Sequence, residues 1–465
     1  MDDKKYKIAI IGSGPGGYVA ALRAGQLGAE VVLIEKESLG GTCLNWGCIP
    51  TKAFVRSAEV FADIQNSEDF GIKVEKAELD FPAVVKRKDK IVNRLVRGID
   101  HLLEKNSVDR IDGQASFIDQ KRLQVKNETE TVEIEAENII IATGSQPASL
   151  PIPGADIEGI LDSRAALDLD NLPESMIIVG GGIIGMEFAF VFSNFGVDVT
   201  VIEYLDQLVS GVDADIASEL NRSARRRRIS IKTSSEVKEI KKSGTAYEVV
   251  YQEKGKEKSA EAERVLMSVG RKPYTDGLGL ENVGVEISKK RGAVQVNEKM
   301  ETNVEGIYAV GDVTDKILLA HVASHQGVIA VENIMGMNKK MNYQAVPGAI
   351  FTSPEIGTVG LTEAEAAAEG IDYEVGTFPF AASGKVMAMG EREGKAKIIT
   401  DKESDKIIGA ALIGIESSDL IAELTLAVNL GLTAENIRET IYAHPTTAEV
   451  IHEAALDLED GAIHA

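Results

Sequence analysis

Residues 7–17 read KIAIIGSGPGG, and this short stretch decides the fold of the N-terminal part of the chain. An apolar run typical of a buried strand passes directly into a cluster of glycines, and a helical pattern follows as far as Gly28. A second apolar run, residues 31–35, reads VVLIE and ends in an acid. The predicted order is therefore strand, glycine turn, helix, strand and carboxylate.

The same order occurs a second time in the chain. Residues 176–185 read MIIVGGGIIG, and residues 199–203 read VTVIE. In both copies the acid follows the last fingerprint glycine by 18 residues, from Gly17 to Glu35 and from Gly185 to Glu203. The sequence thus contains an internal repeat.

Each glycine of the repeat has a physical role in holding a dinucleotide. The first permits a tight turn, the second lets the backbone approach a pyrophosphate, and the third allows helix and strand to pack closely. The acid can accept hydrogen bonds from a ribose. A pair of glycine turns without any ligand is the alternative, but both copies have the required strand, helix and acid. We predict two dinucleotide sites, formed by Gly12, Gly14, Gly17 and Glu35 and by Gly180, Gly182, Gly185 and Glu203.

Two further strand-like segments and a distinct C-terminal region complete the predicted architecture. Residues 139–144 (IIIATG) and 265–270 (VLMSVG) each indicate a buried strand that ends in a glycine turn. Residues 346–465 alternate strand-like and helical pieces and indicate a separate α+β domain. The predicted fold class is α/β, with two Rossmann-like dinucleotide-binding domains and a C-terminal α+β domain.

Charge and composition limit the possible partners. The 465 residues carry 50 basic and 73 acidic side chains, a formal net charge of −23. Such a chain repels phosphate backbones, which argues against nucleic acid and favours a basic protein surface. No apolar run reaches the ~18 residues of a membrane helix, and no signal peptide is evident, so we expect a cytoplasmic protein. A removed organellar presequence stays open, and Arg225–Arg228 forms either a solvated helix end or a phosphate or partner patch.

Residues 40–52 read GGTCLNWGCIPTK and contain both cysteines of the chain, Cys43 and Cys48. On an ideal helix, residues five apart have Cα atoms roughly 8–9 Å apart, whereas a disulfide needs about 7 Å or less. A bonded pair therefore requires a distorted segment, for which Gly47 supplies the freedom. A disulfide closing so small a loop restricts little of the unfolded chain, which favours a redox role. Two buried thiols or half of a metal site are the alternatives, but no second ligand pair at zinc spacing exists, and we expect no metal.

These motifs together resemble the pyridine nucleotide–disulfide oxidoreductases. The resemblance includes the cysteine segment, both fingerprints, residues 302–312 (TNVEGIYAVGD) and residues 444–449 (HPTTAE), and it spans the whole chain. It implies FAD at the first fingerprint, NAD at the second and a C-terminal dimerisation domain. The implied domains are 1–147 for FAD, 148–274 for NAD, 275–345 completing the FAD domain and 346–465 at the dimer interface.

The resemblance also implies roles for individual residues. Cys43 exchanges with a dithiol substrate, Cys48 contacts the flavin, and Lys52 lies near the flavin and pairs with Glu187. His444, held by Glu449, removes a thiol proton in the active site of the neighbouring subunit. Lys52 and Glu187 could instead be surface helix charges, and Glu449 could serve only a capping box that begins at Thr446. The other residues expected to bind cofactor are Thr42, Thr143, Gly144, Gly270 and Asp312.

Within the family, the chain most resembles the NAD-linked enzymes that reoxidise protein-bound dihydrolipoamide. The extra cysteines of mercuric and large thioredoxin reductases are missing, and Glu203–Asp206 is acidic where NADP-dependent relatives carry arginines. The implied partners are a second copy of the chain, lipoyl domains and a basic subunit-binding domain of an acyltransferase, in 2-oxo acid dehydrogenase or glycine cleavage complexes. A reductase of a small disulfide, or a flavin-binding structural or assembly subunit, remains the alternative.

Overall fold

The computed structural model describes residues 5–465, which divide into two compact units. The first takes the described residues up to Ala53 together with 83–148 and 270–342, and the second takes 54–82, 149–269 and 343–465. The four domain boundaries expected from the sequence stay predictions. Segment 54–82, expected in the first domain, groups with the second unit. Within residues 5–465, no helix is both long and apolar enough to cross a membrane.

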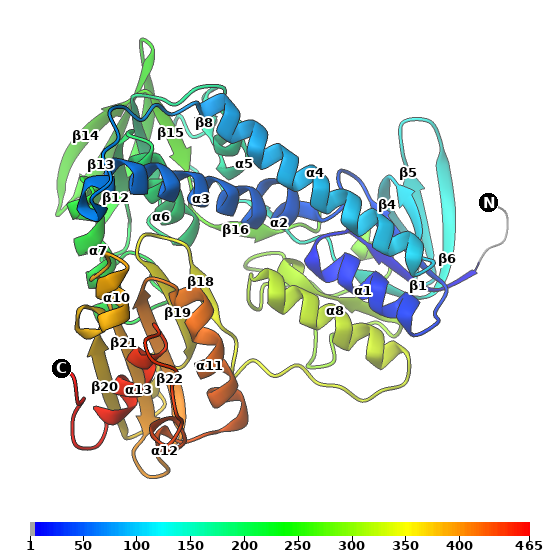
Figure 1. The fold of residues 1–465 in the computed structure, drawn as a ribbon. Coiled ribbons are helices and arrows are strands. Elements are labelled where there is room, and N and C mark those ends of the chain that lie inside the picture. Colours follow the sequence, from blue (N-terminus) through cyan, green and yellow to red (C-terminus); the bar gives the residue numbers. More distant parts are fainter. Residues whose placement is uncertain (1–4) are drawn as a thin grey trace. The chain divides into compact units, whose positions relative to one another are not determined.

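The first unit is built on a seven-stranded sheet whose central strands are parallel (Figure 1). β1 lies between β2 and β6 and is parallel to both, as the strand–glycine turn–strand pattern predicts. β3 and β17 extend the parallel part, whereas β4 and β5 form an antiparallel edge. The strands are β1 (Lys5–Ile11), β2 (Val31–Glu35), β3 (Asp109–Asp112), β4 (Gln114–Asp119), β5 (Arg122–Lys126), β6 (Thr131–Ile141) and β17 (Ile307–Ala309).

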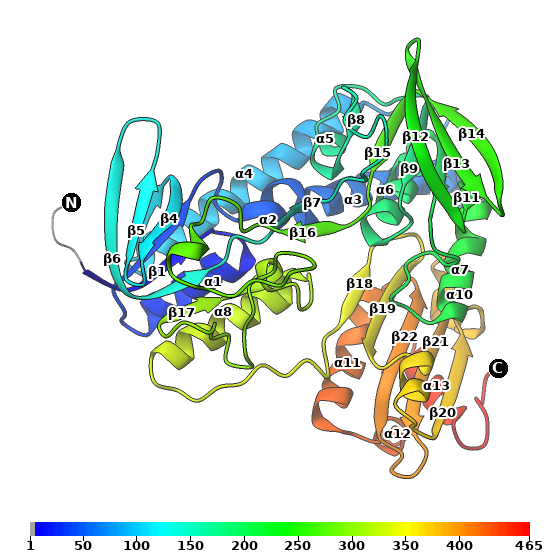
Figure 2. The same ribbon diagram turned by 180° about the vertical axis from the view of Figure 1, so that it is seen from behind.

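Two helices of this unit, α1 (Pro15–Gln26) and α8 (Ala320–Ile334), lie side by side (Figures 1 and 2). Glycines allow this close packing, because a Cβ on Gly327 would lie 2.4 Å from the carbonyl oxygen of Gly16. The long helix α4 (Phe81–Lys105) follows a short one at 67–70 and was not foreseen from the sequence. The short 3₁₀ helices of the chain are η1 (Ser67–Phe70), η2 (Leu280–Asn282), η3 (Gly311–Thr314) and η4 (Phe380–Ala382).

The second unit contains a parallel sheet that repeats the central order of the first. Here β9 lies between β10 and β15, as β1 lies between β2 and β6, so the internal repeat is also a repeat of topology. The elements are β8 (Ile160–Leu161), α5 (Ser163–Leu167), β9 (Ser175–Val179), α6 (Ile183–Asn194), β10 (Asp198–Ile202), α7 (Ala214–Arg226), β11 (Ser230–Lys232) and β15 (Arg264–Met267).

An antiparallel sheet and a two-stranded ribbon accompany these parallel sheets. In the second unit, β12 (Ser235–Ser243), β13 (Ala246–Glu253) and β14 (Lys256–Ala262) form an antiparallel sheet (Figure 2). Apolar side chains, mainly from β12 and β13, share a core with the parallel sheet. In the first unit, the two predicted glycine turns, at Gly144 and Gly270, lead into β7 (Ser145–Pro147) and β16 (Arg271–Pro273), which pair with each other.

The C-terminal part of the second unit is an antiparallel five-stranded sheet in the order β18-β19-β22-β21-β20. Helices α11 and α13 pack against one face of it, and their apolar side chains share a core with the strands (Figure 1). This confirms the predicted α+β domain and the fold class as a whole. The elements are β18 (Gly348–Ile350), β19 (Glu355–Gly360), α9 (Glu363–Ala368), β20 (Tyr373–Pro379), α10 (Gly384–Ala388), β21 (Lys395–Asp401), β22 (Ile407–Gly414), α11 (Ser417–Leu430), α12 (Ala434–Arg438) and α13 (Glu449–Leu456).

Candidate active site

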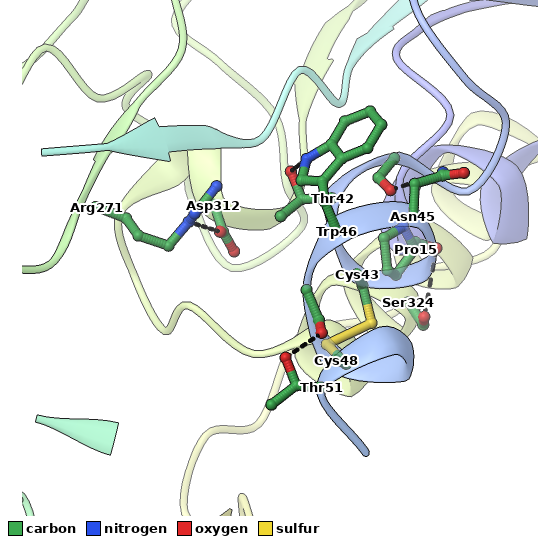
Figure 3. Close-up of a disulfide and its surroundings, with 12 residues drawn as sticks. Pro15, Thr42, Cys43, Asn45, Trp46, Cys48, Thr51, Arg271, Asp312 and Ser324 are labelled. Atoms are coloured by element: carbon green, nitrogen blue, oxygen red, sulfur yellow. Dashed lines mark hydrogen bonds and ion pairs between the residues drawn. A yellow bond between two sulfur atoms is a disulfide. The ribbon is translucent and has the colours of Figure 1, made fainter. Parts of the chain in front are cut away.

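Cys43 and Cys48 form a disulfide across a break between two helices (Figure 3). Helix α2 (Gly41–Trp46) ends before Gly47, and α3 (Cys48–Gln65) begins directly after it. The break brings the two Cα atoms to 4.6 Å, well below the ideal helical spacing, as the bonded pair requires. A Cβ on Gly47 would lie 2.9 Å from the carbonyl oxygen of Thr42 and 3.3 Å from the Cα of Cys43. A side chain at this position would force the closely folded segment to shift.

The cysteine segment is fastened to the first glycine turn. The backbone N–H of Gly40 donates to the carbonyl of Ser13 at 3.0 Å. A Cβ on Gly41 would lie 2.7 Å from the Cα of Gly14, so the start of α2 touches the turn itself. Cys43 is half-buried and Cys48 is exposed. The redox-capable sulfurs are therefore placed next to the predicted FAD site by direct backbone contact.

Both glycine turns have the shape that a dinucleotide needs. The first glycines, Gly12 and Gly180, have φ values of +98° and +106°, which favour glycine. Cβ atoms on the third, Gly17 and Gly185, would clash with the carbonyl oxygens of the first at 1.8 and 2.1 Å. Around the second glycine of each turn, by contrast, an added Cβ would meet nothing within 4 Å, which leaves room for a phosphate at the helix start. The second glycines are Gly14, which precedes α1, and Gly182, which precedes α6.

The two acids after the repeat hold their turns in the same way. Glu35 Oε2 accepts from the Ser13 amide at 2.8 Å, and Glu203 Oε2 accepts from the Gly181 amide at 2.5 Å. The second oxygen of each carboxylate accepts from the amide two residues further on. Glu35 also accepts from the Ser13 hydroxyl at 2.6 Å, a contact that Gly181 cannot make with Glu203. Both acids are buried and keep free lone pairs for a ribose hydroxyl.

Asp312 lies in a polar cluster next to the ribbon of β7 and β16. The hydroxyl of Ser145 donates to Asp312 Oδ2 at 2.5 Å. Arg271 Nε lies 4.0 Å from the same oxygen (Figure 3). Burial raises the pKa of the Asp312 carboxyl, although Ser145 and Arg271 favour its charged form. Ser145 and Arg271 are not among the residues predicted from the sequence. Each directly follows a predicted glycine turn, at Gly144 and Gly270, and this position was the available signal.

The remaining predicted cofactor residues lie at these same turns. The hydroxyl of Thr143 donates to the carbonyl of Tyr274 at 2.6 Å, and Gly144 and Gly270 have φ values of +69° and +100°. Thr42 accepts from the indole N–H of Trp46 at 3.3 Å (Figure 3). These contacts shape the turns, and the cofactor roles of the four residues stay predictions.

His444 and Glu449 form a hydrogen-bonded pair in the second unit. His444 Nδ1 lies 2.8 Å from Glu449 Oε1, and the imidazole side chain is 80% exposed. Burial opposes ionisation of Glu449, but hydrogen bonds from the Thr446 amide and from His444 outweigh it and lower the pKa of the carboxyl. Because a carboxylate only accepts hydrogen bonds, Nδ1 carries the proton and Nε2 of the neutral ring is left as the basic atom.

The capping-box alternative for Glu449 is wrong in its geometry. Helix α13 begins at Glu449 itself, after Ala448, and the Thr446 hydroxyl donates to the carbonyl of Ala443 instead of accepting from the helix. Glu449 Oε2 does accept from the Thr446 amide at 2.9 Å, while Oε1 contacts His444. The carboxylate therefore orders its loop and the imidazole together.

Glu187 and Lys52 differ from the surface charges that were their alternative. Glu187 is only 5% exposed on α6, and its Oε1 accepts from the Phe351 amide at 3.0 Å. Lys52 is half-buried, one turn after Cys48 on α3. The predicted Lys52–Glu187 pair and the role of Lys52 at the flavin stay predictions.

Residues 6–327 match the model of the pyridine nucleotide-disulphide oxidoreductases, and residues 346–455 match the dimerisation domain of the same group. The chain belongs to this family. The predicted resemblance is therefore confirmed. The disulfide and both glycine turns of this oxidoreductase lie within the first match, and the C-terminal sheet lies within the second. The matched dimerisation domain supports a homodimer.

Individual relatives cover nearly the whole oxidoreductase chain. Dihydrolipoyl dehydrogenase of Bacillus subtilis is 41% identical over 447 residues, which are 96% of this chain and 95% of that protein. Dihydrolipoyl dehydrogenase of Halobacterium salinarum is 42% identical over 463 residues, 98% of this chain and 97% of that protein.

Solved structures give the same fold. A Cu(II) complex of RclA, an HOCl-induced flavoprotein disulfide reductase of Escherichia coli, has a TM-score of 0.89 and 32% identity, covering 98% of this chain and 100% of the other. LpdA of Mycobacterium tuberculosis has a TM-score of 0.91 and 28% identity, with coverage of 98% and 100%.

Proposed function

We propose that this chain is a dihydrolipoyl dehydrogenase, which reoxidises protein-bound dihydrolipoamide and reduces NAD⁺. One observation carries the proposal: the Cys43–Cys48 disulfide is fastened by Gly40 and Gly41 to a dinucleotide turn. A group that can exchange with a dithiol therefore lies directly beside the site proposed for FAD. Relatives of that name, about 40% identical over 96% of the chain, support the choice of substrate.

The chain's own groups perform the thiol half of the reaction. His444 Nε2 takes the proton of one substrate thiol, and Glu449 holds the imidazole in the required tautomer and stabilises its protonated form. The thiolate attacks Cys43 Sγ, the Cys43–Cys48 bond breaks, and Cys48 leaves as a thiolate. The second substrate thiol then loses its proton and attacks the substrate sulfur of the mixed disulfide, so that the bond to Cys43 breaks and Cys43 leaves as a thiolate. The substrate departs as a cyclic disulfide, and both cysteines are reduced.

The two cofactors, FAD and NAD, supply the remaining chemistry when bound, by moving an electron pair from the reduced cysteines to NAD⁺ as a hydride. The open backbone at Gly14 and Gly182 would hold the pyrophosphates, and Glu35 and Glu203 would accept hydrogen bonds from the riboses. Asp312, with Ser145 and Arg271, orients the ribityl side of the flavin. A carboxylate at Glu203 repels a 2′-phosphate, which selects NAD over NADP.

The proposal extends to the assembly. Two copies of the chain form a dimer in which His444 of each subunit serves the cysteines of the other. The net charge of −23 suits a basic subunit-binding domain of an acyltransferase. We further propose a cytoplasmic enzyme of a 2-oxo acid dehydrogenase or glycine cleavage complex, supplied with dithiol by lipoyl domains.

Anaerobic flavin reduction tests the activity. We expect dihydrolipoamide to reduce the bound flavin rapidly, and NAD⁺ to reoxidise it with formation of NADH. Glutathione, tested in both redox states, should be slow, and NADP⁺ should replace NAD⁺ poorly. Fast turnover of glutathione disulfide would instead favour a small-disulfide reductase. A flavin that no dithiol reduces would favour a structural or assembly subunit.

A further inference from the structure

A lysine is buried among three carboxylates far along the chain from both glycine turns. Lys397 is 1% exposed, and its Nζ lies 2.7 Å from Asp215 Oδ1 and 3.9 Å from Asp213 Oδ1. It also contacts Glu363 Oε1. Lys395 pairs with the other oxygen of Asp215. Buried lysines are rare unless they are paired, so this contact set is a built feature of the fold.

Strand alternation explains why the lysine faces the carboxylates. Ala396 and Ile398 of β21 belong to the core beneath α11 and α13. Successive side chains of a strand point to opposite faces, so Lys395 and Lys397 lie on the other face. There the ammonium groups meet the start of α7, where Asp213 is the N-cap residue and Asp215 lies in the first turn. Although the three acids are close enough to hold a cation, the Lys397 ammonium already lies among them.

The segment that ends at this cluster packs on the second glycine turn. We call residues 204–213 the 204–213 loop; it joins β10 to α7. The amide of Val209 donates to the carbonyl of Gly181 at 2.9 Å, and the Val209 side chain is buried. A Cβ on Gly181 would lie 2.7 Å from Cδ2 of Leu208, so loop and turn are in direct contact. The amide of the same Gly181 donates to Glu203.

We propose that Lys397 is a positioning residue for the second dinucleotide site, acting through the 204–213 loop. Its ammonium fixes Asp213 and Asp215 at the start of α7, and so fixes the far end of the loop. The near end then supports Gly181 and, through it, the carboxylate of Glu203. This inference rests on the proposed function, because it takes the ligand of the second site to be NAD(H).

The proposed role of Lys397 concerns only the NAD(H) half of catalysis. The ion pairs of Lys397 are with Asp213, Asp215 and Glu363, and they lead to the second glycine turn, not to the groups proposed for thiol exchange. Loss of the anchor should therefore weaken NAD(H) binding and leave reduction of the flavin by dithiol unchanged. If Lys397 served stability alone, its loss would lower the melting temperature without this selective effect.

The test uses Lys397→Met in the flavin-loaded enzyme. We expect KM for NAD⁺ and the dissociation constant for NADH, measured by fluorescence titration, to rise about three- to thirty-fold, the usual range for residues that act through others. The value of kcat at saturating NAD⁺ and the anaerobic rate of flavin reduction by dihydrolipoamide should stay at the parental values. The control is Lys402→Met, which removes an exposed ion pair with Glu374 at the end of the same strand and should change none of these.

A compensated double variant separates positioning from stability. Lys397→Met with Asp215→Asn removes one charge of each sign, and should regain thermal stability while NADH binding stays weak. NADH binding that recovers together with the melting temperature, or that is unchanged in a folded Lys397→Met enzyme, overturns the proposal. If neither variant retains flavin, Asp215→Asn alone decides, because unchanged NADH binding there also overturns it. A parental enzyme that binds NADH but is not reduced by dihydrolipoamide refutes the proposed function without affecting this test.

Discussion

At the scale of residues, Glu203 has a structural role in its turn, and the selection of NAD is the role proposed for it. Its two carboxylate oxygens accept from the amides of Gly181 and Leu205, at 2.5 and 2.7 Å, and its side chain is only 9% exposed. A substitution there changes the charge that a 2′-phosphate meets and also the backbone of the turn. A buried amide left without an acceptor costs roughly 1–3 kcal/mol.

These contacts lead to a graded prediction for Glu203. Glu203→Gln keeps the length and one acceptor oxygen but removes the charge, so we expect the NAD over NADP preference in kcat/KM to fall about tenfold or more. Glu203→Arg supplies a partner for the phosphate, but it leaves both amides unpaired. It should therefore weaken NAD, gain less NADP activity than its charge suggests, and lower the melting temperature. An unchanged NAD/NADP ratio in both variants would place the determinant elsewhere.

The contacts around Asp312 could not be predicted from the sequence. The glycines, Glu35 and Glu203 could be predicted because each role is local to one strand and one turn. Ser145 and Arg271 reach Asp312 from strands more than 120 residues apart in the chain, and no periodicity links them. The Lys397 cluster could not be predicted for the same reason, since its members come from three distant segments that meet only in the folded chain.

At the scale of elements, the interruption between α2 and α3 is the feature that permits the disulfide. The sequence predicts distortion at Gly47, because an unbroken helix would hold the two cysteines too far apart, and the structure places the break at this residue. By contrast, segment 283–300 carries many charges and alternates only weakly, which is typical of a solvated stretch. Val283, Val285 and Val294 are in fact buried in the first core, because a weakly alternating, charged segment can still place its apolar side chains on one inward face.

The local sequence predicted the structure of the arginine run, Arg225–Arg228, only in part. Its expected place at a helix end is confirmed, since α7 ends at Arg226. Arg226 and Arg227 both pair with Glu393, at 2.7 and 3.2 Å, and Arg227 also lies over the ring of Phe190. These two side chains are used within the second unit, which argues against four free arginines acting as a phosphate patch.

Gly47→Ala tests the importance of the break. The added Cβ would press on Thr42 and Cys43, so we expect a loss of about 1–3 kcal/mol in the free energy of unfolding of the oxidised enzyme. The fraction of Cys43–Cys48 disulfide after air oxidation, counted by thiol titration, should also fall. Gly98→Ala is the matched control: Gly98 is exposed within α4, and its Cβ would meet nothing within 4 Å. That change should be neutral or stabilising by about 0.5–1 kcal/mol. Equal behaviour of the two variants would show that the break tolerates a side chain.

At the scale of the whole molecule, the chemistry is divided between the two compact units. The disulfide lies in the first unit, whereas the His444–Glu449 pair lies in the second, within the family's dimerisation domain. A homodimer offers a reason for this division. If the histidine of one subunit serves the cysteines of its partner, assembly is a condition of activity and not only of stability.

Mixing two inactive variants tests this sharing of sites. His444→Gln and Cys48→Ser chains should each lack dihydrolipoamide oxidation when alone, because one lacks the base and the other the disulfide. In a heterodimer, one site combines an intact histidine with an intact cysteine pair, while the other site carries both defects. Random exchange of subunits from equal amounts should therefore restore about one quarter of the parental activity per chain.

The controls make the outcome unambiguous. Each variant mixed only with itself should remain inactive after the same exchange treatment, and heterodimers should be verified with distinguishable tags. In His444→Gln alone, the dithiol-to-flavin step should be slow, while reduction of the flavin by NADH should stay fast, since hydride transfer needs no base at that position. Verified heterodimers without restored activity would mean that a single chain builds its own site. A fast dithiol-to-flavin step in His444→Gln would remove His444 from the reaction, and Glu449 would keep only the hydrogen bond that orders the loop before α13.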